Sequence, residues 1–150
     1  MTDRDLIEKK LAQIETCVAD LRRLARPAEI DRDVREQRFV EHTLQLAIQA
    51  ALDVASHIVA DERLGEPSTN RELFDLLRRG GYVNDALAAT LQNMAGFRNI
   101  LVHGYDTVDL AIVRDVTEHL LDDLVAFVDT IRAWMAVTTY LISDYKFLYE

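Results

Sequence analysis

The sequence contains few residues that interrupt regular structure or cross-link a chain. Its 150 residues include one cysteine, two prolines and five glycines. A lone cysteine, Cys17, excludes an intrachain disulfide, so nothing here points to an oxidising compartment. The few glycines and prolines fall between stretches with apolar periodicity, which favours an all-α chain.

Long uncharged apolar runs are also missing. No stretch approaches the roughly 20 uncharged apolar residues of a membrane-spanning helix. Residues 1–5 lack the basic-then-apolar plan of a signal peptide, so a cytoplasmic location is the default expectation. Hydrophobic residues make up 49% of the chain, enough for residues 1–150 to form one globular domain with its own core.

Basic residues are in the minority, with 17 Lys and Arg against 26 Asp and Glu and a net charge of -9. Proteins that bind nucleic acid usually carry a basic surface, because neutralising phosphates supplies much of the affinity. RNA binding would therefore need a local basic cleft, although an ordinary solvated helix charge explains each candidate better. The candidates are Arg22, Arg23, Arg26, Arg32, Arg35, Arg38, Arg71, Arg78 and Arg79.

Apolar periodicity in the first half of the chain predicts two helices. The first is expected over about residues 3–25, with Pro27 at or just past its end. The second is longer, over about residues 32–63, and Asp31 is its expected N-cap.

The second half predicts three more helices. Thr69 and Glu72 make a capping-box pattern before a short helix over residues 71–79. A helix then begins near residue 84 and leads into the motif described next. We expect a final helix to run unbroken from residue 106 or 107 to about residue 138.

The chemically richest stretch follows the apolar part of that fourth helix. It holds Arg98, Asn99, His103 and Tyr105 within eight residues. At about 100° per residue, Asn99 and His103 share a helix face, whereas Arg98 and His103 diverge by roughly 140°. Gly104 permits the backbone to leave the helix just after His103, which could return His103 and Tyr105 toward Arg98. We therefore expect these groups to line one small pocket, provided that the helix frays there.

These residue types suit the cleavage of a phosphodiester without a metal. Arg98 offers a permanent planar cation for phosphate oxygens, and His103 titrates near neutrality and can act as a general acid or base. In such a reaction the 2′-hydroxyl of RNA attacks, and Arg98 stabilises charge on the pentacoordinate phosphorus. The spacing has a second explanation, because cations near a helix C-terminus gain about 0.3–1 kcal/mol from the helix dipole.

The order Arg, four residues, His, one residue, Tyr resembles the motif of the HEPN superfamily, and the chain looks like its HepT branch. Arg98, Asn99, His103 and Tyr105 fill that motif without departure. The resemblance extends over about residues 5–135. It includes the stretch 44–57, Pro67, the stretch 73–77, Gly80 and the stretch 91–97.

The resemblance implies a fold and an activity. The fold is an antiparallel, up-and-down bundle of four to five helices, with residues 136–150 as an apolar, aromatic tail beyond its core. The activity is that of a metal-independent endoribonuclease toxin that cleaves tRNA or mRNA at two sites in a homodimer cleft and uses no cofactor. The implied partner is a minimal nucleotidyltransferase (MNT) antitoxin that transfers AMP to Tyr105.

The resemblance also implies roles for the site residues. Arg98 and His103 would be catalytic, and Asn99 would position the substrate or His103. In the second helix, Asp53 would face the Arg–His cleft and bind Arg98 or orient His103. A solvated helix edge explains Asp53 equally well, and it explains His57, four residues on, better than a place in the cleft does. We expect the apolar tail to pack against a partner or a second copy of the chain.

Two other functions stay open on the sequence. A non-catalytic helper would present nucleotide or substrate to the nucleotidyltransferase, with Arg98 and His103 holding phosphate without cleaving it. A purely structural helical bundle would use neither residue. Other site chemistries are disfavoured, because the sequence has no Glu-x-x-His pair, no Cys/His zinc spacing and no glycine-rich phosphate loop.

Overall fold

A computed structural model describes residues 3–103 and 109–149, with only the backbone described at residues 103, 139 and 142–149. The described chain is entirely helical, which confirms the all-α class. Its elements are α1 (Arg4–Leu24), the 3-10 helix η1 (Pro27–Glu29), α2 (Val34–Asp61), α3 (Asn70–Arg79), α4 (Asp85–His103), α5 (Leu110–His119) and α6 (Leu121–Tyr149).

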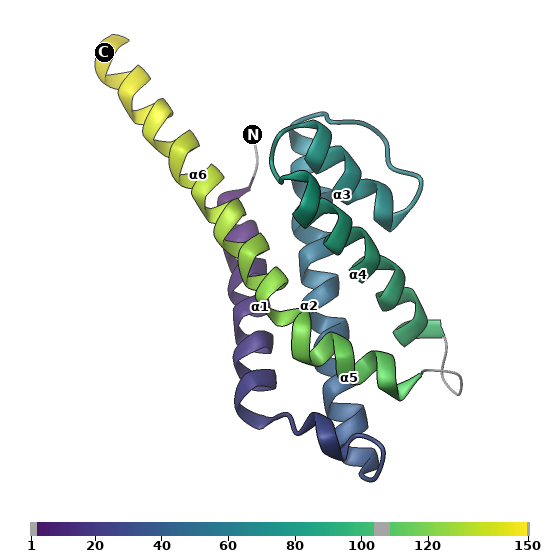
Figure 1. Cartoon of the computed structure of the whole chain (residues 1–150). Coiled ribbons are helices and arrows are strands. Elements are labelled where there is room, and N and C mark those ends of the chain that lie inside the picture. Colours follow the sequence, from purple (N-terminus) through teal and green to yellow (C-terminus); the bar gives the residue numbers. More distant parts are fainter. Residues whose placement is uncertain (1–2, 104–108, 150) are drawn as a thin grey trace.

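Helix α2 is the centre of the bundle, because it contacts all five other α-helices. Helices α1 and α6 pack together on one side of it, and α3 and α4 pack together on the other (Figure 1). Helix α5 crosses the bundle near η1 and connects the two sides. The C-terminal end of α4, which carries the motif, therefore lies at the edge of the α3–α4 pair.

The sequence of α2 explains its central position. Leu44, Ile48 and Ile58 are fully buried, each worth about 1.5–3 kcal/mol relative to exposure. Between them, small buried alanines such as Ala51 allow neighbouring helices to approach closely. Cys17 on α1 is buried beside this core, as expected for a small core residue, and burial raises the pKa of its thiol.

The start of α2 differs from the prediction by one acidic residue. Asp33 is the N-cap, and its carboxylate accepts a hydrogen bond from the backbone N–H of Arg35 at 2.9 Å. Asp31 was the wrong choice, because its carboxylate binds the guanidinium of Arg114 on α5 instead. Two aspartates so close in sequence are equivalent caps by type, and only the tertiary contact distinguishes them.

The predicted single C-terminal helix is also wrong, because the chain bends at Leu120 between α5 and α6. Arg114 ties α5 to η1 by donating to the carbonyl oxygen of Pro27 at 3.1 Å, whereas α6 packs along α1. One straight helix cannot make both contacts. The sequence does signal the break, since Asp122 and Asp123 place two acidic side chains in the first turn of α6.

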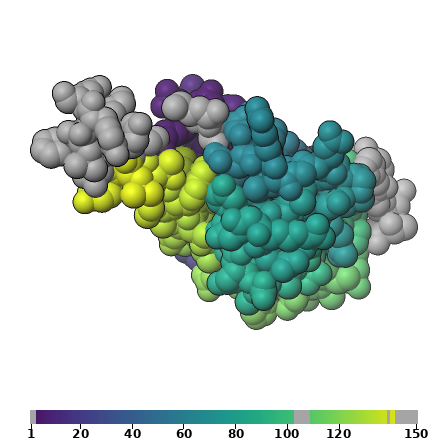
Figure 2. Space-filling view, turned by 90° about the horizontal axis from the view of Figure 1, so that it is seen from above, coloured from purple at the N-terminus to yellow at the C-terminus, as the bar shows by residue number. Residues whose placement is uncertain are grey.

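Two elements bear on the expectations for membranes and for the tail. By length and composition alone α2 could cross a membrane, but 61% of its most apolar 18-residue window is buried inside the bundle, as in a core helix. Helix α6 continues through the expected tail and leads away from the body (Figure 1). In Figure 2 its yellow segment before residue 142 lies at the edge of the molecule. Val137, Tyr140 and Leu141 are exposed there, so burial of the tail against a partner or second copy stays a prediction.

Candidate functional site at the end of α4

Helix α4 is fixed at its start by a side-chain cap and carries Arg98 near its end. The Asn84 side chain accepts a hydrogen bond from the backbone N–H of Leu87 at 2.7 Å. Arg98 lies on the same side of the helix as the buried Leu91 and Met94, at three- and four-residue spacings, and is half-buried. Arg98 is therefore turned toward the bundle rather than away from it.

The guanidinium of Arg98 has unused hydrogen-bonding capacity. Its Nε is buried and has no acceptor among the described residues. Its Nη1 donates to Oδ1 of the neighbouring Asn99 at 3.5 Å, at the long limit for a hydrogen bond. A buried, unpaired donor on a charged group costs about 1–3 kcal/mol or more. An incoming acceptor such as a phosphate oxygen would relieve that cost.

The remaining motif residues lie partly outside the described chain. Asn99 is exposed, and α4 stays helical through His103, so the helix does not fray before that residue. Regular helix geometry then keeps positions 98 and 103 about 140° apart. The side chain of His103 and all of Gly104 and Tyr105 fall outside the described residues. The shared pocket therefore stays a prediction.

The carboxylate of Asp53 is engaged on the α1 side of α2. Its Oδ2 lies 3.0 Å from Nζ of Lys10, and its Oδ1 accepts a hydrogen bond from Nε2 of Gln49 at 2.9 Å. The pair with Lys10 joins residues 43 positions apart, and the sequence gave no sign of it. The role of Asp53 in supporting Arg98 or His103 stays a prediction, and the structure does not bring Asp53 and Arg98 together as a bonded pair within the described chain.

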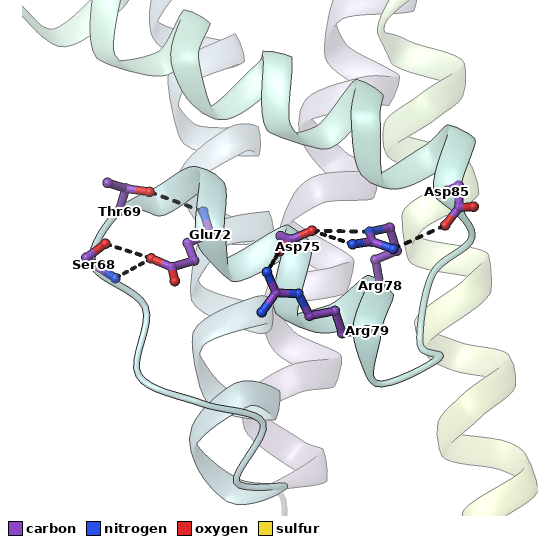
Figure 3. A network of polar contacts seen from close by, with 7 residues as sticks. All are labelled: Ser68, Thr69, Glu72, Asp75, Arg78, Arg79 and Asp85. Atoms are coloured by element: carbon purple, nitrogen blue, oxygen red, sulfur yellow. Dashed lines mark hydrogen bonds and ion pairs between the residues drawn. The ribbon is translucent and has the colours of Figure 1, made fainter.

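A charged network joins α3 to the start of α4 (Figure 3). Asp75 Oδ1 lies 2.8 Å from Arg78 Nη2, Asp75 Oδ2 lies 2.7 Å from Arg79 Nη2, and Arg78 also reaches Asp85 at 3.6 Å. The hydrogen bond from Arg78 holds the pKa of Asp75 below its ordinary value. Arg78 and Arg79 therefore have carboxylate partners on the protein itself, which weakens their case as RNA ligands.

The predicted capping box at the start of α3 is confirmed. Thr69 Oγ1 accepts from the backbone N–H of Glu72 at 3.2 Å, and Glu72 accepts from the backbone N–H and the hydroxyl of Ser68 at 2.8 and 2.7 Å (Figure 3). The hydrogen bond from the Ser68 hydroxyl is the main reason why the pKa of Glu72 is lowered. These local hydrogen bonds fix the first turn of α3.

A cavity of about 470 Å³ lies at the C-terminal end of α2. Its lining residues are Ser56, Val59, Ala60, Arg63, Gly65, Glu66, Pro67 and Leu73. None of them is a predicted site residue. Within the described chain, no group of three or more His, Cys, Asp or Glu side chains is placed to hold a metal ion.

Known proteins share this sequence and fold. The chain is 34% identical over 130 residues to the mRNA nuclease HepT of Shewanella oneidensis, covering 86% of this chain and 98% of the relative. It is 38% identical over 74 residues to the tRNA nuclease HepT of Aphanizomenon flos-aquae, covering 49% of this chain and 50% of the relative.

A solved structure agrees with these relatives. The tri-AMPylated HEPN toxin of Shewanella oneidensis, solved in complex with MNT antitoxin, superposes with a TM-score of 0.81 at 33% identity. That match covers 87% of this chain and 99% of the toxin. The family model described as ribonuclease HepT-like matches residues 7–131, which include Arg98, Asn99, His103 and Tyr105. The chain therefore belongs to the HepT-like family of HEPN proteins.

Proposed function

We propose that this chain is the toxin of a HEPN/MNT toxin–antitoxin pair and cleaves tRNA or mRNA as an endoribonuclease. Its HepT relatives are named as mRNA and tRNA nucleases, which supports this activity. The observation that carries the proposal is the half-buried guanidinium of Arg98, whose Nε has no acceptor among the described residues. The proposed working unit is one HEPN domain with its core over about residues 5–135, acting in the cytoplasm.

The proposed chemistry needs neither a metal nor a cofactor. A general base takes the proton of the RNA 2′-hydroxyl, and the resulting oxygen attacks phosphorus. The bond from phosphorus to the 5′-oxygen breaks, and a general acid protonates that oxygen. The products are a 2′,3′-cyclic phosphate and a 5′-hydroxyl end. Arg98 binds the charge that develops on phosphorus, and His103 transfers a proton.

A homodimer fits this chemistry better than a single chain does. Regular α4 geometry places positions 98 and 103 about 140° apart, and two proton transfers call for two titratable groups. Two chains meeting at the ends of their α4 helices would place two copies of Arg98 and His103 around one cleft. Asn99 then positions the substrate or His103, and Asp53 supports the site from α2.

The proposed partner is an MNT nucleotidyltransferase that silences the toxin by transferring AMP to Tyr105. The Shewanella oneidensis toxin is named as tri-AMPylated and in complex with MNT antitoxin, which supports this partner. An attached AMP adds bulk and negative charge where the substrate phosphate must bind. The modified toxin would then exclude RNA by both size and charge.

Expression of the chain without its partner tests the proposed activity. We expect arrest of bacterial growth and cleavage of cellular RNA, with both lost in His103→Ala. His119→Ala is the matched control, because His119 is an exposed histidine of α5 whose Nδ1 contacts Asp115, away from the motif. This control should arrest growth as the intact chain does.

The same experiment separates the enzyme from the non-catalytic helper. An intact, well-folded chain that neither arrests growth nor cleaves RNA contradicts the nuclease and favours the helper, which would hold phosphate without breaking it. Toxicity that persists unchanged in His103→Ala would show that His103 has no part in the activity.

A further inference from the structure

Arg71 of α3 contacts α4 at Gly96. An ideal Cβ built on Gly96 would lie 2.9 Å from Arg71 Nη2, 3.2 Å from Nε and 3.4 Å from Cζ. Because the two nitrogens are nearer than the central carbon, the Nε–Nη2 edge of the guanidinium faces the bare backbone of Gly96, and Nη1 lies on the far side. Any other residue at position 96 would occupy that space.

Arg71 differs from the two other arginines of α3 in having no carboxylate partner among the described residues. Both oxygens of Asp75, the acidic residue one turn along α3, are occupied by Arg78 and Arg79. The carboxylate of Glu72 accepts from Ser68. In a chain of net charge -9, Arg71 is thus an exposed cation that the described acidic side chains leave uncompensated.

The position of Gly96 places this cation on the side of α4 that carries position 103, whereas Arg98 lies about 160° away around the helix. Positions 96 and 103 are seven residues apart on α4, so they return to within about 20° of the same azimuth, about 10 Å apart along the axis. Asn99, which is exposed, lies about 60° from that line. Arg71 and position 103 therefore mark one continuous side of α4.

The glycine itself has no role in a turn here. Gly96 is in the interior of α4, where glycine is a poorer helix former than alanine. A helix-interior glycine indicates close approach of another group, and the group that approaches is the guanidinium of Arg71.

We propose that Arg71, held against Gly96, binds a backbone phosphate of the RNA beside the one that is cleaved. The proposal rests on the proposed nuclease function and adds a positioning residue outside the Arg-x4-His-x-Tyr motif. The Nη1 side of the guanidinium faces away from Gly96 and has no bonded partner among the described residues, so it is suited to phosphate oxygens. The contact fixes the register of the strand and carries no sequence information.

RNA binding can be measured without cleavage in the full-length His103→Ala chain. The probe is an end-labelled single-stranded RNA of mixed sequence, titrated at several salt concentrations. Adding Arg71→Gln should weaken binding several-fold and make the slope of log K against log [salt] shallower by about 0.7, the value for one lost phosphate contact on a single strand. Arg79→Gln removes the same charge from the same helix and should leave the slope unchanged, because Asp75 already neutralises Arg79.

Gly96→Ala tests the position of Arg71 without removing its charge. The added methyl group displaces the guanidinium, while alanine favours the helix, so the melting temperature should stay equal or rise. Weaker RNA binding by a chain that is at least as stable excludes simple misfolding as the cause. Unchanged RNA binding by Gly96→Ala would show that the contact of Arg71 with Gly96 is not needed for binding.

The outcomes also separate this proposal from the nuclease function. Binding by the parent chain that is unaffected by Arg71→Gln, or affected equally by Arg79→Gln, overturns the phosphate site alone. RNA cleavage by the intact chain that is lost in His103→Ala would still stand in that case. No measurable RNA binding by the His103→Ala chain overturns the phosphate site, and the absence of RNA cleavage by the intact chain overturns the nuclease.

Discussion

Arg98 and Tyr105 are proposed to act in opposite ways on the negative charge at the site: Arg98 binds it, and Tyr105 adds it once AMP is attached. Arg98 offers to an incoming phosphate a donor that has no acceptor among the described residues, and the AMP proposed for Tyr105 brings a phosphate of its own. The two residues are seven positions apart in the sequence. The proposal therefore joins the activity and its control in a single motif.

Modification of Tyr105 is a prediction at this scale. Co-expression with the proposed MNT nucleotidyltransferase partner should add AMP to the peptide that contains Tyr105, as detected by tandem mass spectrometry. Tyr82 packs against Trp134 with ring centroids 5.0 Å apart and serves as an unmodified control. Tyr105→Phe should carry no AMP and should stay toxic in the presence of the partner. Absence of any added nucleotide on the intact chain contradicts this switch.

The role of a single residue could be predicted from the sequence when its partner is close in the sequence, and not when the partner is far away. Thr69 as the cap of α3 rests on residues three apart, and it was confirmed. Asp33 displaced Asp31 as the cap of α2 because Arg114, 83 positions away, binds Asp31. Asp53 contacts Lys10 across 43 positions, and Arg71 contacts Gly96 across 25 positions. A helical pattern does not specify contacts between residues so far apart.

At the scale of elements, one arginine links α6 to α1. Arg132 on α6 lies 2.6 Å from a carboxylate oxygen of Glu8 and 2.6 Å from one of Glu15. These two glutamates are about two helical turns apart on α1. All three side chains are partly exposed, so water screens their charges. The network therefore stabilises the fold by only about 0.5–1 kcal/mol. The hydrogen bond from Arg132 lowers the pKa of Glu15.

This link predicts a pH-dependent loss of stability. Arg132→Met keeps the apolar stem and should lower the free energy of unfolding by about 0.5–1 kcal/mol at pH 7, measured by urea denaturation. The folded-state pKa of Glu15 lies below its unfolded value of 4.5, so its share of the interaction is complete above that pH. This contribution of Glu15 is lost as the pH falls through its lowered pKa. The free energies of unfolding of Arg132→Met and the intact chain should therefore converge at low pH.

Arg35→Met is the matched control for this measurement, because the guanidinium of Arg35 is exposed and has no ion pair among the described residues. It should change the stability little at either pH. A gap between Arg132→Met and the parent chain that stays constant from pH 7 to below pH 4.5 would contradict the role given to Glu15.

The helices themselves were largely predictable, and their breaks were not. Apolar periodicity located α1, α2 and α3 within a few residues of their observed bounds. The same periodicity merged α5 with α6, since no glycine or proline separates them. The bend at Leu120 arises because α5 must reach η1 and α2 while α6 follows α1, and only packing decides that.

At the scale of the whole molecule, the net charge of -9 opposes RNA binding everywhere except at a local site. The described ion pairs show how such a site can arise. Among the described residues, Arg22, Arg114 and Arg132 pair with carboxylates, whereas Arg71 and Arg98 have no carboxylate partner. Arg35 on α2 also lacks one, but Arg71 and Arg98 belong to the α3–α4 pair that carries the motif.

The far end of α6 is the part of the molecule least explained by the family. The family match ends at residue 131, and α6 continues to Tyr149. Its exposed Val137, Tyr140 and Leu141 lie outside the matched region. A role for this extension in packing against a partner or a second copy stays a prediction, independent of the cleavage chemistry.

The central claim is that Arg98 and His103 direct the RNA's own 2′-hydroxyl against phosphorus, and the ends of the products test it most directly. RNA cleaved by the purified chain in the presence of EDTA should carry 2′,3′-cyclic phosphate and 5′-hydroxyl ends by mass spectrometry. A single 2′-deoxy substitution at the cleaved position should abolish the cut there. Products with 5′-phosphate and 3′-hydroxyl ends, or cleavage that survives the 2′-deoxy substitution, would contradict the claim.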